Sequence, residues 1–222
     1  MRVAVVIPAY QAAATIGEVV SQTLGVLPDA NLIVVDDGSA DGTGEAGRGK
    51  GTTVVTHPRN RGKGAALRTG IARARADGAE VIVTIDADGQ HPAAEIPRLV
   101  QPIAAGAADL VLGARARNGA MPVSRRLTNW LSASVASRIG RQAIRDAQTG
   151  FRAFTRALAE RVQPAGDRYE FEANFLLEAL RAGYRVTSVE VPTIYGAPSH
   201  FRYFGDTWRM VRAFAQQLGL RD

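Results

Sequence analysis

Two acidic residues follow an apolar run near the middle of the chain. Residues 81–85 are typical of a buried strand, and Asp86 and Asp88 come directly after them, followed by Gln90. Side chains two residues apart on an extended chain point to the same side, so both carboxylates are expected at the end of this strand. Close carboxylates repel each other unless a cation lies between them, and oxygen ligands favour Mg²⁺ or Mn²⁺. The pattern predicts a metal site at these three residues, with a polar turn that caps a helix as the alternative.

Polar residues also mark the ends of neighbouring elements. The first apolar run ends near Tyr10, whose ring can stack on or flank a base. Asp36 and Asp37 end the second run and can accept hydrogen bonds from a base or a ribose. Lys63 lies between glycines at the start of a helical pattern, where a cation and free N–H groups suit a diphosphate. Together these residues predict a nucleotide site beside the metal.

The elements that must position these residues alternate regularly in the first half of the chain. Short apolar runs are typical of buried strands, and Ala-rich amphipathic stretches between them are typical of helices. This alternation predicts an α/β fold with a mostly parallel, doubly wound sheet, helices on both faces, and ligands at the carboxyl ends of the strands. The expected strands are 3–7, 32–35, 52–56, 81–85 and 110–112, and the expected helices are 13–24, 64–76 and 94–104.

The second half of the chain does not continue this regular alternation of strand and helix patterns. Between residues 122 and 141, apolar residues recur at helical spacing with arginines between them. This pattern fits a helix that covers the core and exposes a basic face, or a helix that lies on a membrane surface. Further helices are expected at 170–182 and 206–218, and a strand at 185–191.

Positive charge is concentrated in one region. The 222 residues include 27 Lys and Arg and 21 Asp and Glu, which gives a net charge of +6. Residues 115–161 alone carry +8, which leaves −2 for the remainder. This distribution indicates one anion-binding region on a nearly neutral body. A nucleic-acid-binding module is a remote alternative, because aromatic residues make up only 6% of the chain and no nucleic-acid motif occurs.

Composition excludes several other classes. With 46% hydrophobic and 22% charged residues, the chain can bury a core and is not disordered. The absence of cysteine excludes disulfides and thiol catalysis and fits a reducing compartment. Every apolar run is shorter than the roughly 18 residues needed to span a bilayer, so a soluble or peripherally bound protein is expected.

Eight motifs resemble those of a known enzyme family. Ile-Pro-Ala-Tyr at 7–10, Val-Val-Asp-Asp-Gly-Ser-Ala-Asp-Gly-Thr at 34–43, Asn-Arg-Gly-Lys-Gly at 60–64 and Asp-Ala-Asp-Gly-Gln-His-Pro at 86–92 are similar to motifs of family 2 glycosyltransferases. Asp-Ala-Gln-Thr-Gly-Phe-Arg at 146–152, Tyr-Glu-Phe-Glu at 169–172, Val-Pro-Thr-Ile-Tyr-Gly at 191–196 and Ser-His-Phe-Arg at 199–202 narrow the resemblance to the polyprenyl-phosphate sugar synthases. That group contains dolichyl-phosphate mannose synthase.

The resemblance implies a GT-A fold and an inverting, metal-dependent transfer of a hexose to a polyprenyl phosphate. The donor would be a nucleotide-diphospho-sugar of the GDP-mannose or UDP-glucose type, with Mg²⁺ or Mn²⁺ as cofactor. We expect one domain spanning 1–222, with a nucleotide-sugar and metal half at 1–115 and an acceptor half at 116–222. Members of the family commonly have an acid where this chain has Ala12, so one expected ribose contact differs.

The resemblance also assigns roles to individual residues. The metal and the diphosphate would bind at Asp86, Asp88 and Gln90. The nucleotide would be lined by Pro8, Ala9, Tyr10, Asp36, Asp37 and Lys63. The acceptor phosphate would face Arg115, Arg125 and Arg202, with Asp146 near the reaction centre.

The nature of the acceptor decides whether a general base is needed. A phosphate monoester is already anionic near pH 7, because its second pKa is about 6. A family 2 enzyme that acts on a saccharide hydroxyl is the alternative, and it would need a base such as Asp146 or Glu172. Many family members continue into membrane-spanning helices. Here we expect peripheral contact at the cytoplasmic membrane face through amphipathic surfaces or a separate anchor protein, and no nucleic-acid partner.

Overall fold

We describe the fold from a computed structural model of the chain. It describes residues 1–49, 51–115, 123–168, 170–192 and 194, with only the backbone for 123–127. The predicted helix at 206–218 and Arg202 lie outside these ranges.

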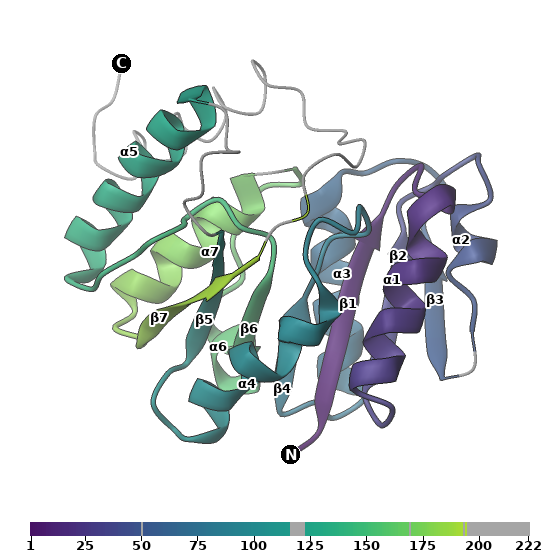
Figure 1. Ribbon diagram of the computed structural model, residues 1–222, viewed down its shortest axis with the longest axis horizontal. Coiled ribbons are helices and arrows are strands. Elements are labelled where there is room, and N and C mark those ends of the chain that lie inside the picture. Colours follow the sequence, from purple (N-terminus) through teal and green to yellow (C-terminus); the bar gives the residue numbers. More distant parts are fainter. Residues whose placement is uncertain (50, 116–122, 169, 193, 195–222) are drawn as a thin grey trace.

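Seven strands of the described residues form one sheet at the centre of the molecule (Figure 1). The strand order is β3-β2-β1-β4-β6-β5-β7. All neighbouring strands run parallel except β6, which is antiparallel to both β4 and β5. The strands are β1 (Val3–Ala9), β2 (Asn31–Asp36), β3 (Thr52–Thr56), β4 (Val81–Thr84), β5 (Leu110–Arg115), β6 (Arg152–Thr155) and β7 (Val186–Val191).

Helices cover both faces of the sheet and create two apolar cores. On one face, α1 (Ala13–Val26), α2 (Thr43–Ala46) and α4 (Ile96–Ala104) pack on the sheet, and a 3₁₀ turn (Ala93–Glu95) precedes α4. On the other face lie α3 (Lys63–Ala76), α6 (Arg156–Arg161) and α7 (Glu170–Arg181), and α5 (Val123–Gly140) contacts α7. The central strands are buried on both sides, which explains why they are continuous apolar runs rather than alternating ones.

The predicted parallel sheet is confirmed, and the structure adds an antiparallel strand that the sequence pattern did not indicate. Strand β6 lies between β4 and β5, with Val83 opposite Ala153 and Val111 opposite Ala153 on the other side. Just before β6, the Gly150 carbonyl accepts a hydrogen bond from the Thr84 hydroxyl at 2.8 Å. The inserted strand therefore brings the segment 146–152 to the carboxyl end of β4, where Asp86 lies.

Helix α5 agrees with the predicted helical spacing but buries only part of its apolar surface. Ala133 and Ala136 are buried in the core shared with α7. Trp130 and Leu131 are 56% and 49% exposed. Within the described ranges, no helix has the length and apolar character required to cross a bilayer.

Candidate active site

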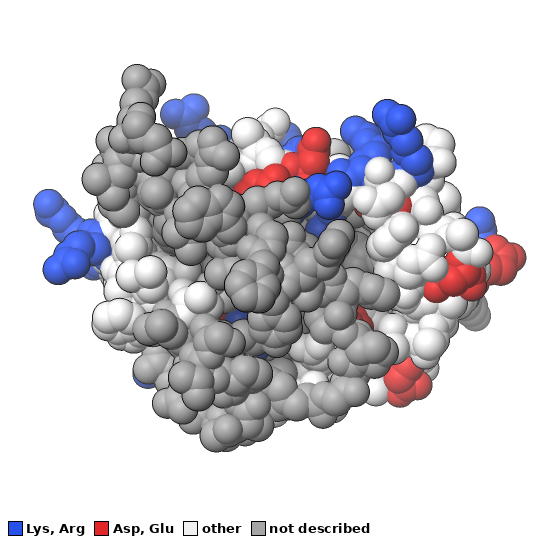
Figure 2. All heavy atoms as spheres, turned by 90° about the horizontal axis from the view of Figure 1, so that it is seen from above, with Lys and Arg blue, Asp and Glu red and all other residues white. Residues whose placement is uncertain are grey.

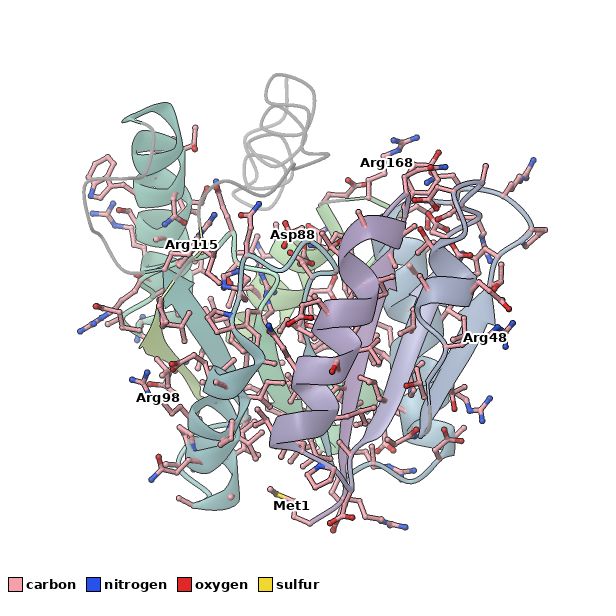
Figure 3. All side chains as sticks on the ribbon, turned by 45° about the vertical axis from the view of Figure 1, so that its right-hand side comes forward. Met1, Arg48, Asp88, Arg98, Arg115 and Arg168 are labelled. Atoms are coloured by element: carbon pink, nitrogen blue, oxygen red, sulfur yellow. The ribbon has the colours of Figure 1, made fainter. Side chains whose placement is uncertain are left out.

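The carboxyl ends of β1, β2, β4 and β5 share one edge of the molecule, at the top of Figure 1. Seen from above, acidic and basic side chains adjoin on this edge (Figure 2). Asp88 and Arg115 both lie there, and Met1 lies at the opposite end (Figure 3). The parallel topology therefore gathers polar residues that are far apart in the sequence.

An ammonium group shared by two carboxylates occupies this edge. The Lys63 Nζ atom lies 2.6 Å from Asp86 Oδ1 and 3.2 Å from Glu172 Oε1. Burial opposes ionisation of Asp86, but the Lys63 ammonium holds its pKa below the ordinary value. Burial raises the pKa of Glu172 despite the same ammonium. The cluster is therefore a partly desolvated site with more acidic than basic groups.

Two glycines bring Lys63 to this position. Gly62 caps α3 with φ of +100°, a conformation that favours glycine. A Cβ atom on Gly64 would lie 2.7 Å from the Phe171 Cβ atom and 2.8 Å from the Gly166 carbonyl oxygen. This close approach of α3 to the start of α7 places Lys63 against Glu172.

Asp88 provides a second carboxylate beside Asp86. It lies in the turn after β4, and its Oδ1 atom accepts a hydrogen bond from the Gln90 N–H at 3.0 Å. Burial and the negative charge of Asp86 raise the pKa of Asp88. Repulsion of this kind favours a bound cation between or beside the two acids.

The residues fit a divalent cation that a substrate helps to bind. Among the residues that the structure describes, no three His, Cys, Asp or Glu side chains converge as metal ligands. Mg²⁺ commonly binds through one or two carboxylates together with substrate phosphates rather than in an all-protein cage. Asp86 and Asp88 match that donor set, and the raised pKa of Asp88 indicates an excess of negative charge. Gln90 is half-buried in the same turn.

Gly150 forms the wall of the carboxylate cluster. A Cβ atom there would lie 2.7 Å and 2.9 Å from the two Asp86 carboxylate oxygens and 2.9 Å from Glu172 Oε1. Because glycine has no side chain, the Asp86 and Glu172 carboxylates can occupy the space that a Cβ atom at position 150 would fill.

Gly150→Ala is expected to lower the free energy of unfolding by about 1–3 kcal/mol, because the methyl group must displace carboxylates that Lys63 holds. Urea denaturation measures this change. Gly25→Ala in α1 is the matched control, since a Cβ there meets no atom within 4 Å. Equal effects of the two substitutions would contradict the tight fit at Gly150.

A second ion pair lies at the end of β5. The Arg115 guanidinium binds the Asp146 carboxylate through Nε at 2.8 Å and Nη2 at 3.2 Å. Asp146 also accepts hydrogen bonds from the backbone N–H groups of Arg115 and Gln148. Burial opposes ionisation of Asp146, yet Arg115 keeps its pKa below the ordinary value. The pair fixes the orientation of a cation that is 13% exposed at the site edge.

The predicted nucleotide residues divide into buried and exposed groups. Pro8 and Ala9 are buried at the end of β1, and Tyr10 is 42% exposed. Asp36 is buried and accepts a hydrogen bond from the Ser39 N–H at 3.0 Å. The Tyr10 ring is exposed at the edge of the site, where a ligand can reach it. Asp36 instead holds the loop that follows β2 through its hydrogen bond with Ser39.

Asp37 is engaged inside the protein. Its carboxylate lies 2.6 Å from His57 Nδ1 and accepts hydrogen bonds from the N–H groups of Arg61 and Gly62. Thr69 contacts the other imidazole nitrogen of His57 at 2.9 Å. Asp37 therefore fixes the loop that leads into Lys63, and its predicted contact with the nucleotide stays a prediction.

His91 is a buried imidazole near both ion pairs. Its ring packs on Phe151 with centroids 5.3 Å apart, and its Nδ1 atom has no hydrogen-bond partner among the residues that the structure describes. Burial lowers the pKa of His91 to about 4, against an ordinary 6.5, although nearby Asp86 opposes this shift. The imidazole is therefore neutral at pH 7.

Because unfolding restores an ordinary pKa, the unfolded chain binds the His91 proton more readily between pH 6.5 and pH 4. Over this window we expect wild type to lose up to about 3 kcal/mol more folding stability than His91→Gln. Urea denaturation at several pH values measures the difference. Parallel pH profiles for the two proteins would contradict a buried neutral His91.

Two predicted acceptor contacts lie beyond the described side chains. Arg125 lies in α5, where only its backbone is described, and Arg202 lies outside the described ranges. Conversely, the sequence patterns did not indicate the roles of Gly150, the pairing of Glu172 with Lys63, or the burial of Arg152. All three residues lie in the motifs 146–152 and 169–172, so the family resemblance was the only indication in the sequence that they matter.

Comparison of the sequence with known proteins identifies its relatives. The family described as Glycosyl transferase family 2 matches residues 4–163. A UDP-N-acetylglucosamine–dolichyl-phosphate N-acetylglucosaminyltransferase from Methanococcus voltae is 30% identical over 215 residues, which cover 86% of this chain and 84% of the relative. An undecaprenyl-phosphate mannosyltransferase from Micrococcus luteus is 29% identical over 209 residues, covering 88% and 84%.

Comparison of structures gives the fold. Glucosyl-3-phosphoglycerate synthase from Mycobacterium tuberculosis, crystallised with Mn²⁺, UDP and phosphoglyceric acid, superposes with a TM-score of 0.81. The match covers 100% of this chain and 80% of that one at 24% sequence identity. At this identity the likeness establishes the fold alone, and it confirms the expected GT-A architecture.

Proposed function

Because this chain belongs to glycosyl transferase family 2, we propose that it moves a hexose from a nucleotide-diphospho-sugar to a polyprenyl phosphate. Its membership and its relatives make it a glycosyltransferase. The donor, the acceptor and the dependence on a divalent metal are the parts that we propose.

The observation that carries the proposal is that an acidic site for a cation and a basic site for a phosphate lie on the same edge of the sheet. Asp86 and Asp88 form an acidic site that suits a cation bound to a diphosphate. Arg115, oriented by Asp146, offers a guanidinium that suits a phosphate. Lys63 completes the donor side. Such a site can hold two anionic substrates close together, which is the main difficulty of this reaction.

The transfer forms a bond between an acceptor phosphate oxygen and the anomeric carbon, and it breaks the bond from that carbon to the diphosphate. Direct displacement of this kind inverts the anomeric configuration. The acceptor phosphate is anionic near pH 7, so it needs no strong general base. A divalent cation, when bound by Asp86 and Asp88 with Gln90, supplies positive charge that stabilises the departing nucleoside diphosphate. Lys63 would add charge on the same side.

The relatives support the choice of substrates. The names of the Methanococcus and Micrococcus relatives specify dolichyl phosphate and undecaprenyl phosphate, with N-acetylglucosamine and mannose as the sugars. The Mycobacterium tuberculosis neighbour binds Mn²⁺ and UDP. We extend Mn²⁺ or Mg²⁺, a nucleotide-sugar donor and a polyprenyl phosphate acceptor to this chain on that basis. Further proposed contacts are Pro8, Ala9, Tyr10, Asp36 and Asp37 for the nucleotide, and Arg125 and Arg202 for the acceptor.

A polyprenyl phosphate is anchored in a membrane by its lipid chain, so an enzyme that uses it must bind it at the membrane surface. Helix α5 exposes Trp130 and Leu131, and Arg138 is exposed two turns further along. Aromatic, aliphatic and basic side chains on one helix suit an interface with anionic lipid. We propose peripheral contact at the cytoplasmic membrane face, directly or through a separate membrane anchor.

The alternative acceptor, a saccharide hydroxyl, would require a general base. Asp146 already binds Arg115 through both carboxylate oxygens, and its lowered pKa makes it a weak base. Glu172 is paired with Lys63. Burial raises the pKa of Glu172, so Glu172 stays the candidate base of this alternative, whereas the ion pair of Asp146 favours a phosphate acceptor, which carries its own negative charge.

The proposal is tested with purified protein, Mn²⁺ or Mg²⁺, polyprenyl phosphate and a panel of radiolabelled GDP- and UDP-sugars. We expect one donor to give label that partitions into organic solvent, and omission of the metal to abolish it. Label that stays in water-soluble oligosaccharide would favour the saccharide acceptor, and no product with any donor would overturn the proposal.

A further inference from the structure

Glu172 contributes a carboxylate to the donor side of the site. It is not one of the residues proposed to bind the metal. Its Oε1 atom lies 3.2 Å from the Lys63 ammonium, which also lies 2.6 Å from Asp86 Oδ1. The Glu172 side chain is only 10% exposed. One ammonium therefore has two buried or half-buried carboxylate partners.

Groups other than Lys63 hold the backbone of Glu172. Glu172 lies in the first turn of α7, where the helix dipole favours a negative charge. Its backbone carbonyl accepts a hydrogen bond from Arg152 Nη1 at 2.7 Å. Arg152 is itself buried and donates to the carbonyls of Thr149 and Ala147. Arg152 therefore holds the backbone at Glu172, from which the side chain reaches Lys63.

A divalent cation at Asp86 would compete directly with Lys63. Both would be positive groups on one carboxylate, and like charges at contact distance repel strongly in a site of low exposure. If Asp86 were the only partner of Lys63, cation binding would leave a desolvated ammonium without compensation. Glu172 removes that difficulty because it already contacts the same Nζ atom.

Resting on the proposed function for the metal and the donor, we propose that Glu172 is a positioning residue for Lys63. Glu172 holds the ammonium when the divalent cation takes Asp86. Lys63 thereby stays at the donor site, aimed at the diphosphate, and Asp86 is free to bind the cation.

The test measures binding of Mn²⁺ alone, using the electron paramagnetic resonance signal of free Mn²⁺. Wild type is compared with Glu172→Gln, Lys63→Met and the double variant. Glu170→Gln is the matched control, because it removes one carboxylate from the same turn of α7 outside the cluster. Circular dichroism establishes that each variant is folded.

We expect Glu172→Gln to weaken Mn²⁺ binding about 10-fold, the lower end of the effect of residues that support metal ligands. Glu170→Gln should change it by less than about 2-fold. Lys63→Met removes the competing cation, so Mn²⁺ should bind at least as tightly as to wild type. In that background Glu172→Gln should have little further effect, because there is no ammonium left to hold.

Three results would overturn the inference and leave the proposed metal site standing. The first is unchanged Mn²⁺ affinity in folded Glu172→Gln. The second is an equal effect of Glu172→Gln with and without Lys63, which would indicate a simple loss of negative charge. The third, which applies even if Glu172→Gln does not fold, is weaker Mn²⁺ binding to Lys63→Met. A wild type that binds no Mn²⁺ even when GDP or UDP is added would overturn the metal site of the proposed function as well, so the two failures are distinguishable.

Discussion

Asp88→Asn is expected to lower the rate of sugar transfer by at least about 100-fold without unfolding the protein. Asn keeps the shape of the side chain and an oxygen that accepts the Gln90 N–H hydrogen bond. It removes the charge that a divalent cation needs. Since burial and Asp86 already oppose ionisation of Asp88, the loss of charge should not lower folding stability.

Initial rates of lipid-linked product at saturating Mn²⁺ measure this effect, and urea denaturation measures stability. Asp29→Asn makes the same chemical change at an exposed turn and should retain full activity. An Asp88→Asn protein with wild-type activity would exclude Asp88 from the metal site.

Asp146→Ala is expected to lower the free energy of unfolding by about 3–5 kcal/mol and to abolish transfer. Asp146 is 2% exposed and accepts four hydrogen bonds, three of them from Arg115. Removing one member of a buried ion pair leaves the other charge desolvated, which accounts for the large effect. The acceptor guanidinium also loses the contact that orients it.

A double variant, Arg115→Met with Asp146→Leu, distinguishes the pair from general loss of packing. It should be more stable than Asp146→Ala, because both charges are removed together. Urea denaturation of the three proteins at pH 7 provides the comparison. An Asp146→Ala protein as stable as wild type would contradict a buried pair.

The pH at which these proteins are compared matters. Burial opposes ionisation of Asp146, but Arg115 holds its native pKa below the ordinary value of 3.8. The ion pair therefore stabilises the fold fully above pH 3.8, and this contribution is lost as the pH falls through the native pKa. Measurements at pH 7 record its whole effect.

The sequence predicted the parallel core because each central strand is an apolar run bounded by polar or glycine residues. Residues 52–56 agree with β3 at both ends, and the other expected strands lie within one to three residues of the observed boundaries. The carboxyl-edge placement of Asp86, Asp88 and Lys63 followed from this topology. Local pattern was sufficient there because burial on both faces requires continuous apolar residues.

Strand β6 could not be predicted in the same way. It has four residues, begins with a buried Arg152 and is antiparallel between β4 and β5. Its position depends on contacts with strands far away in the sequence, and the Arg152 guanidinium donates hydrogen bonds to three backbone carbonyls that the fold brings together. The same reasoning applies to Glu172, whose pairing with Lys63 requires two helix starts to meet.

Asp37 illustrates a different limit. Its position at the end of β2 was correctly expected at the site edge, and its carboxylate is engaged by His57 and by two backbone N–H groups. A motif indicates where an acid lies but not which groups it contacts. Its interior contacts still serve the site, because they fix the loop before Lys63.

The most direct measurement is the identity of the product that the purified chain forms from polyprenyl phosphate and its accepted donor. Mass spectrometry should detect a polyprenyl phosphate that has gained one hexose, and nuclear magnetic resonance should show an anomeric configuration opposite to that of the donor. Sugar attached to a saccharide, or polyprenyl phosphate recovered unchanged while the donor is consumed, would contradict transfer to a lipid phosphate.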